Sequence, residues 1–331
     1  MDDYMEDYYD DYRDDYRYIE EPINSFSWSL ARDTQFNDCK RSYYYQYYEY
    51  FHSWLYERNS RKYRINVLRN LTTKEMWIGK IVHEMIPVII WNFRQFGRFD
   101  FSRADEILTR KMHNDWCNSR DRYIYYDAKA YVGLAEHFYG LPITDEDFED
   151  ALQKVRASIQ AFYALPDIDR FLDHKTSGSS EIEKNSQFSH NDILVTARLD
   201  YLSVTKDGAL IIDWKTGKMN QLARSIDRQL GIYALYVKQK YNLSSDQIQA
   251  WDINLLNSGA RNQHQISPET IAETSYYITE SARKMKDMLI DPEENKADIR
   301  DFPMQTDRKC SFCNYRAACF PRRYPFPEMP A

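Results

Sequence analysis

The sequence predicts an α/β fold in which helical segments surround a small group of strands. Residues 193–204 are rich in Ile, Leu, Val and Thr. They lead through a turn that ends at Gly208 into a second apolar run, which stops at Asp213. Residues 250–256 form a third strand-like run, and stretches with helical periodicity precede and follow these strands.

Length and composition limit the class of protein. A chain of 331 residues can bury a sizeable core as one large domain or two. It contains no apolar run long enough to span a bilayer, and its first residues are acidic, unlike a signal peptide. An odd number of cysteines, five, argues against a disulfide framework. We therefore expect a cytoplasmic protein without a membrane segment.

The negative charge is concentrated at one end of the chain. Residues 1–21 contain ten Asp or Glu and two Arg, a net of −8, so subtracting this from the total of −7 leaves +1 for the rest. Residues 1–22 form a low-complexity Asp/Tyr tail, which we expect to be disordered. Because the remaining body is near neutral, its charge does not exclude a nucleic-acid partner.

The other elements follow in order along the chain. Residues 36–51 predict a tyrosine-rich helix, whose rings suit a core edge or a stacking surface. A capping box at 72–75 opens a helix of about twenty residues, which Pro87 should kink or divide. The remaining expectations are helices over 98–170, a polar stretch over 167–191 with a loop near 178, a helix after Ser225 and a helix over 268–290.

The central hairpin carries charged residues that a buried strand does not need. Asp200 lies in its first strand, and Asp213 and Lys215, two positions apart in the second, point to one face. Neighbouring carboxylates repel unless a cation neutralises them, and oxygen ligands favour Mg²⁺ or Mn²⁺. A lysine beside such an ion can hold attacking water and offset charge on a phosphate. The simpler interpretation is a surface hairpin with an ordinary Asp-x-Lys ion pair.

Two helices supply further polar pairs. His83 lies four residues after Gly79, which leaves room for another backbone to approach the same helix face. Gln229 and Tyr233 are also four residues apart, and an amide with a phenol suits a phosphate oxygen or a base edge. The alternatives are a buried core histidine and a chance pair.

Three cysteines near the end of the chain have metal-ligand spacing. They form the motif Cys310-x2-Cys313-x5-Cys319, and a fourth ligand would come from Cys39 or Cys117. Four thiolates can hold zinc or an iron–sulfur cluster, and the spacing does not separate the two. Cys117, in the helical middle of the chain, is expected to be a small core hydrophobe.

Taken together, these features resemble the RecB-type PD-(D/E)XK nucleases that carry an iron–sulfur cluster. That group includes the CRISPR-adaptation exonucleases, the AddB nuclease subunit and exonuclease V. The resemblance covers about residues 25–320 and rests on six elements in order: Cys39, Gly79-x3-His83, Asp200, Asp213-Trp214-Lys215, Gln229-x3-Tyr233 and the terminal cysteine motif.

The resemblance implies a role for each of these residues. A divalent metal, Mg²⁺ or Mn²⁺, would be held by His83, Asp200, Asp213 and the backbone carbonyl of Trp214. Lys215 would position and activate water, and Gln229 and Tyr233 would line the DNA groove. Cys39 and the three terminal cysteines would hold a [4Fe–4S] cluster that joins the two ends of the chain. Glu181 or Glu183 resembles the acidic residue that the family places before its first core strand.

The family implies a restriction-endonuclease-like core, with a central mixed sheet flanked by helices. We expect five regions: the tail (1–22), a helical segment with Cys39 and the histidine motif (23–96), a helical insertion (97–170), the nuclease core (171–300), and the cysteine cluster with a proline-rich end (301–331). Ala197 departs mildly from the family, which often has Gly at that position.

The implied activity is metal-dependent hydrolysis of DNA, most simply from single-stranded ends. One alternative is a subunit that binds or processes DNA ends within a helicase–nuclease or CRISPR-adaptation complex. Another is a structural or regulatory cluster protein, which would not need Lys215.

Overall fold

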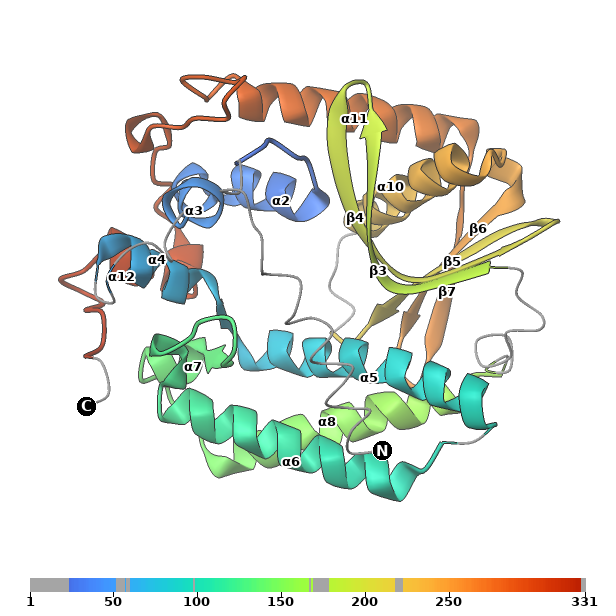
Figure 1. Ribbon diagram of the computed structural model, residues 1–331, viewed down its shortest axis with the longest axis horizontal. Coiled ribbons are helices and arrows are strands. Elements are labelled where there is room, and N and C mark those ends of the chain that lie inside the picture. Colours follow the sequence, from blue (N-terminus) through green and yellow to red (C-terminus); the bar gives the residue numbers. More distant parts are fainter. Residues whose placement is uncertain are drawn as a thin grey trace.

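The computed structural model describes residues 24–51, 57, 60–97, 99–166, 168, 179–217 and 223–328, so the acidic tail lies outside the described residues (Figure 1). The helices are α2 (Leu30–Asp38), α3 (Lys40–Tyr44), a π-helical turn (Tyr45–Glu49), α4 (Arg61–Arg69), α5 (Lys74–Phe96), α6 (Phe101–Arg120), α7 (Ala135–Phe138), α8 (Asp145–Tyr163), α10 (Ala223–Tyr241), α11 (Pro268–Lys286) and α12 (Arg316–Cys319). The strands are β1 (Leu71–Thr72), β2 (Gly133–Leu134), β3 (Ser179–His190), β4 (Ile193–Thr205), β5 (Gly208–Lys215), β6 (Ile248–Asn254) and β7 (Ala260–Gln265).

A five-stranded mixed sheet forms the centre of the molecule, in the order β3-β4-β5-β6-β7. Neighbouring strands are antiparallel except β5 and β6, which are parallel. Parallel neighbours need a crossover, and α10 supplies it. The predicted α/β class is confirmed, and the mixed sheet flanked by helices is consistent with a restriction-endonuclease-like core.

The predicted central hairpin is also confirmed. Its strands are β4 and β5, which pair from Thr205↔Gly208 to Tyr201↔Ile212. Gly208 has φ 153°, and a Cβ there would lie 2.4 Å from the carbonyl oxygen of Gln247. Only glycine fits this turn without strain.

Two strands of the sheet were not predicted. β3 falls in the stretch expected only to be polar, and β7 falls where no element was expected. The only buried residues of β3 are Glu181 and Ser186, so it lacks the apolar alternation by which half-buried strands are found. Its hydrogen-bonded partner β4, rather than its own sequence, holds it in the sheet.

Helices cover both faces of the sheet (Figure 1). On one face Ile212, Trp214 and Ile253 pack in a core with α5, α6 and α8. On the other face Ile211 and Ala250 pack in a core with α10 and α11. Because α6 and α8 share a core with the sheet, the helices of residues 97–170 are built into the domain rather than appended to it.

Helix α5 runs unbroken for 23 residues with Pro87 inside it. The expected division at this proline does not occur. Pro87 removes the N–H that would bond the carbonyl of His83 and its ring crowds that carbonyl, but apolar packing along Ile81, Ile86 and Ile90 holds the helix together. Neither α5 nor any other described helix is long and apolar enough to cross a membrane.

A third core joins the two ends of the described chain. Tyr45, from the π-helical turn, and Tyr315, from the segment before α12, lie in it with ring centroids 5.3 Å apart. Arg41 donates a 2.7 Å hydrogen bond to the carbonyl of Phe302. The segments that carry Cys39 and the terminal cysteines are therefore neighbours in space.

Candidate active site

The candidate site lies where the pairing of β3 with β4 is interrupted. Pairing between β3 and β4 passes from Ile182↔Tyr201 to Lys184↔Leu199, so Glu183 and Asp200 drop out of the ladder opposite each other. Glu183 has φ 48°, a conformation that non-glycine residues seldom adopt. The register is the same on both sides of this gap, so no residue is inserted, and the left-handed backbone of Glu183 interrupts the regular alternation of side chains.

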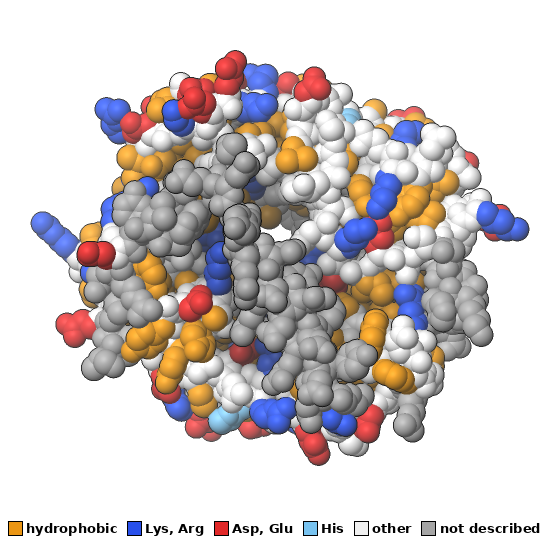
Figure 2. All heavy atoms as spheres, in the orientation of Figure 1, with side chains coloured by type: hydrophobic (Ala, Val, Ile, Leu, Met, Phe, Trp, Pro, Cys, Tyr) orange, Lys and Arg blue, Asp and Glu red, His pale blue; other side chains and the backbone are white. Residues whose placement is uncertain are grey.

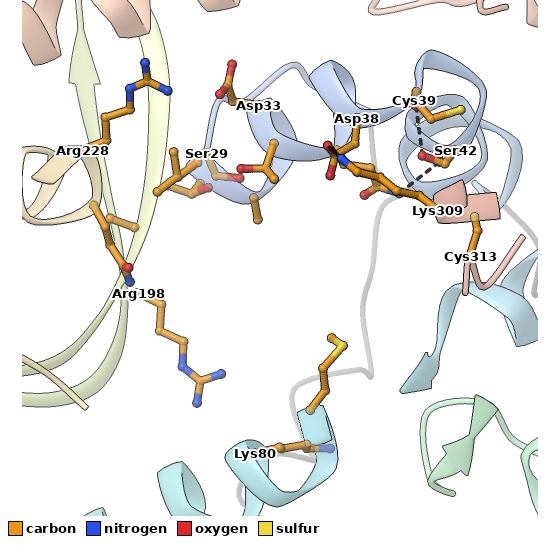
Figure 3. A pocket seen from close by; sticks show the side chains of 18 of the residues that line it. Ser29, Asp33, Asp38, Cys39, Ser42, Lys80, Arg198, Arg228, Lys309 and Cys313 are labelled. Carbon is orange, nitrogen blue, oxygen red and sulfur yellow. Dashed lines mark hydrogen bonds and ion pairs between the residues drawn. The ribbon is translucent and has the colours of Figure 1, made fainter. Parts of the chain in front are cut away.

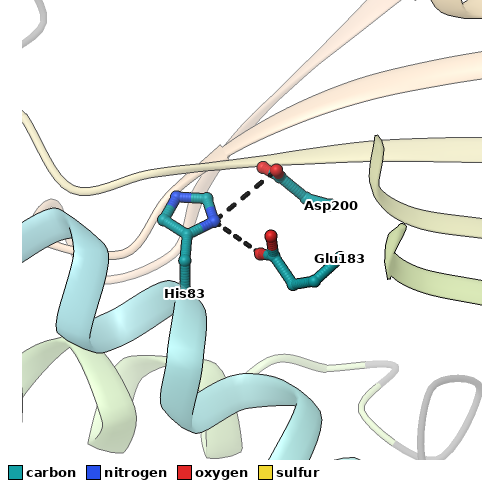
Figure 4. A group of neighbouring side chains, drawn as sticks. All are labelled: His83, Glu183 and Asp200. Carbon is teal, nitrogen blue, oxygen red and sulfur yellow. Dashed lines mark hydrogen bonds and ion pairs between the residues drawn. The ribbon is translucent and has the colours of Figure 1, made fainter. Parts of the chain in front are cut away.

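His83 reaches this break from α5 (Figure 4). Its Nδ1 lies 2.6 Å from Glu183 Oε1 and 3.5 Å from Asp200 Oδ1. One ligand atom from each of the three residues lies within 4.8 Å of the other two. A nitrogen and two carboxylate oxygens at this spacing suit a divalent cation. Gly79, one turn earlier, is approached by a side chain and not by the expected backbone, since a Cβ there would lie 3.0 Å from Thr216 Oγ1.

The charges around His83, Glu183 and Asp200, the trio, favour a positive charge between the two carboxylates. Burial, and then the neighbouring charge of Asp213, raise the pKa of Asp200 well above its usual range, although Asp200 Oδ2 accepts a 2.8 Å hydrogen bond from the Trp214 amide. Burial alone would lower the pKa of His83, but Glu183 and Asp200 outweigh it and raise the pKa to about 9. Carboxylates crowded in this way are stabilised by any bound cation.

Asp213 and Lys215 share one face of β5, as predicted. Lys215 Nζ lies 2.5 Å from Asp213 Oδ2 and donates a 2.9 Å hydrogen bond to Gln229 Oε1. Gln229 Nε2 donates to Asp213 Oδ1 at 2.7 Å, so the amide holds both charged groups. Burial raises the pKa of Asp213, and the charge of Lys215 opposes this shift.

Gln229 and Tyr233 lie on one face of α10, as predicted, but they are held inside the protein. Gln229 Nε2 donates to the Tyr233 hydroxyl at 2.8 Å, and that hydroxyl donates to the Arg198 carbonyl at 2.6 Å. Tyr233 is only 5% exposed. In this geometry the pair supports Asp213 and Lys215 more directly than it offers a surface to a ligand.

The structure decides between the two glutamates that the sequence could not separate. Glu183 lies in the trio with His83. Glu181 instead accepts hydrogen bonds from Tyr236 and Tyr241 and forms an ion pair with Lys240. Residues two apart in a strand normally share a face, and the left-handed backbone at Glu183 breaks that rule here.

Sequence reasoning missed a second polar group beside Asp213. Asp252 is its partner in register on β6 and is 4% exposed. Asp252 accepts hydrogen bonds from Asn262 at 2.9 Å and from His264 Nε2, while His264 Nδ1 lies 3.0 Å from Asp227 Oδ1 on α10. The only sequence signal was an aspartate inside an apolar strand.

The four cysteines of the predicted cluster line one cavity: Cys39, Cys310, Cys313 and Cys319. Burial raises the pKa of the Cys313 thiol to about 11, and the neighbouring thiols add to this shift. Cys39 lies at the junction of α2 and α3, where its extended backbone breaks the helical run. Cys117, on α6, is not among the residues that line this cavity.

The same cavity, of ≈ 1560 Å³, extends from the cysteines to the His83 trio. Figure 3 shows Arg198 and Arg228 on one side of it, Lys80 on a second and Lys309 near the cysteines. On the face seen in Figure 2, basic and acidic side chains of the described residues are intermixed. The cavity is lined by both cations and carboxylates, and some of them are paired across it, as Arg198 is with Glu183 at 3.0 Å.

Comparison with known proteins agrees with this geometry. The sequence model of the PD-(D/E)XK nuclease superfamily matches residues 27–320, which include every candidate site residue. A search of curated proteins gives no match. Among solved structures, the chain is similar to one titled "Crystal structure of SSO0001", with 13% identity, a TM-score of 0.29, and coverage of 53% of this chain and 77% of that chain. A similarity this low carries no argument, whereas the family match spans most of the sequence. The chain therefore belongs to the PD-(D/E)XK nuclease superfamily.

Proposed function

We propose that the protein is a metal-dependent deoxyribonuclease that hydrolyses phosphodiester bonds, acting as an exonuclease on single-stranded ends. The observation that carries the proposal is the position of the His83–Glu183–Asp200 group beside the ion pair of Asp213 and Lys215. A surface hairpin with an ordinary ion pair would not place three further ligand atoms against a buried aspartate.

The residues of the trio fit a magnesium or manganese ion. His83, Glu183 and Asp200 would hold it, with Asp213 and the Trp214 carbonyl on the adjoining strand as further candidate ligands. When bound, such an ion polarises the scissile phosphate and lowers the pKa of bound water. Lys215, held by Asp213 and Gln229, would orient the attacking water and offset charge on the phosphate.

The cavity supports a flexible single strand as substrate. At ≈ 1560 Å³ it exceeds the about 300–1,000 Å³ of ordinary small-molecule sites. It is lined from several sides by α2, α5, β4 and the C-terminal segment, and this arrangement suits a strand that can bend more than a rigid duplex. Arg198 and Arg228 lie where they could contact phosphates.

We also propose that the four cavity cysteines hold a [4Fe–4S] cluster. All four line one cavity, where the segment between α2 and α3 meets the C-terminal segment. Four thiolates gathered from the two ends of the chain are a ligand set that such a cluster uses.

The test of the nuclease proposal is incubation of the full chain with end-labelled single- and double-stranded DNA in Mg²⁺, Mn²⁺ or EDTA. We expect cleavage with either metal, none in EDTA, and mononucleotides released from single-stranded ends. Lys206→Ala and Asp207→Ala, in the exposed turn of the same hairpin, are matched controls and should cleave normally. Binding of ends without cleavage would instead favour an end-binding subunit that works within a helicase–nuclease or CRISPR-adaptation complex.

A further inference from the structure

Arg316 is a buried cation whose charge no group in the described residues neutralises. It lies between Cys313 and Cys319 and is 2% exposed. One nitrogen, NH1, donates a 2.8 Å hydrogen bond to the Ser311 carbonyl. Its Nε and NH2 are buried and have no hydrogen-bond partner among the described residues. Arginine carries five N–H donors and cannot be neutralised by deprotonation, so this arrangement is costly.

The surroundings of Arg316 are aromatic rather than acidic. The guanidinium carbon lies 3.5 Å from the ring centroid of Tyr139 and 5.5 Å from that of Tyr324. Burial lowers the pKa of Arg316, and Tyr139, Tyr324, Cys313 and, least of all, Glu136 oppose the shift. Glu136 forms no ion pair with Arg316. Contacts with aromatic faces recover only part of the cost of burying a charge.

The neighbouring thiols suggest what completes this site. Arg316 lines the cavity together with all four cysteines, and the Cys313 thiol acts on it electrostatically. Four thiolates bring more negative charge than a zinc ion or an iron–sulfur core cancels. A metal–thiolate group on these cysteines would therefore be a buried anion beside a buried, unpaired cation.

We propose that Arg316 is the counter-cation of a metal–thiolate group held by Cys39, Cys310, Cys313 and Cys319. The inference rests on the proposed cluster but not on the nuclease reaction. Arg316 would help retain the metal by balancing the thiolates' charge. In an iron–sulfur cluster it would also raise the reduction potential, because a nearby positive charge stabilises the more negative reduced state.

The test compares Arg316→Gln, which removes the charge, with Arg316→Lys, which keeps it. The control is Arg322→Gln. Arg322 is an exposed arginine just after the cysteine motif and is not among the residues that line the cavity, so its loss should matter little. Full-length proteins are prepared anaerobically, analysed for iron, sulfide and zinc, and exposed to a chelator. The reduction potential of any iron cluster is measured by spectroelectrochemistry.

We expect the Gln variant to lose metal about tenfold faster than wild type, with a more negative potential. A tenfold change in the one-electron equilibrium corresponds to about 59 mV. The Lys variant and Arg322→Gln should stay close to wild type. Equal retention and potential in the Gln variant would overturn the proposal, and so would a Lys variant as defective as Gln, which would indicate packing alone. Wild-type protein without metal on its cysteines would overturn the cluster itself, while the cleavage assay would still judge the nuclease separately.

Discussion

Glu183 and Asp200 face each other at the one position where the β3–β4 ladder is interrupted, and both turn toward His83. The irregular backbone thus brings these candidate metal ligands together, because a regular ladder would keep both carboxylates in the strand alternation. Backbone strain of this kind persists where the surrounding structure enforces it, and here it coincides with the candidate metal ligands.

Replacing Glu183 tests the cation site. Glu183→Gln removes one anionic ligand and should weaken Mn²⁺ binding by about 10- to 100-fold, as measured by calorimetry. Glu181→Gln, two residues away in the same strand, is the matched control and should bind Mn²⁺ as wild type does, because Glu181 contacts Lys240 and tyrosines instead. Equal affinities for all three proteins would place the metal elsewhere.

The chemistry should depend on the ion pair of β5. Asp213→Ala and Lys215→Ala should each abolish cleavage while folding and single-stranded DNA binding remain, because both groups act on the reacting phosphate rather than on the fold. Cleavage rates and binding by fluorescence anisotropy would be measured on the same preparations. Metal-dependent cleavage that survives both β5 changes would show that the site is misplaced.

His83→Ala should act mainly through weaker metal binding, so excess Mn²⁺ should partly restore its rate of cleavage.

The hydrogen bonds of His264 should affect the rate of cleavage by positioning Asp213 and Lys215. His264 links buried Asp252 to Asp227 on α10, two residues before the Gln229 that holds Asp213 and Lys215. His264→Ala should therefore lower kcat, by about tenfold, with little change in KM, because the loss is in positioning and not in substrate contact. His264→Gln can keep one hydrogen bond and should recover part of the rate. A pure rise in KM would instead place His264 against the substrate.

Acid should destabilise the protein partly through Glu181. Burial alone would raise the pKa of Glu181, but hydrogen bonds from Lys240 and two tyrosines lower it to about 2. A carboxylate whose folded pKa lies below its unfolded value of about 4.5 stabilises the fold above pH 4.5. That contribution is lost as the pH falls from 4.5 toward 2. The difference in unfolding free energy between wild type and Glu181→Gln, measured by urea denaturation, should thus shrink between pH 6 and pH 3. A constant difference would contradict the assignment.

Four cysteines should bind the metal cluster, and the fifth, Cys117, should not. Anaerobically prepared protein should be brown, and Cys39→Ser should bleach it and lower its stability, because the lost ligand frees two distant chain segments. Cys117→Ser should change neither colour nor stability, since Cys117 does not line the cysteine cavity. Colourless protein with stoichiometric zinc would show that the cysteines hold zinc and not an iron–sulfur cluster. A bleached Cys117 variant would reassign the fourth ligand.

Local rules predicted those parts of the site that depend on local structure. Turn chemistry and the two-residue period placed Asp213 and Lys215 on one face, and helical spacing paired Gln229 with Tyr233. The choice between Glu181 and Glu183 could not be made this way, because the left-handed backbone at Glu183 overrides alternation in a strand of polar residues. The pairing of Asp213 with Asp252 depends on the register of two parallel strands joined by a helix, which no short pattern encodes.

The wide separation of the ligands along the chain has a consequence during synthesis. His83 and Glu183 are 100 residues apart, and Asp200 follows on the next strand. When α5 has been synthesised, the chain therefore contains His83 but neither Glu183 nor Asp200. Lys215 emerges last of the hydrolytic groups, and Gln229 and Asp252 follow it still later. Contacts between residues this far apart in the chain form late in folding, so the candidate site is complete only after Asp252 has been made.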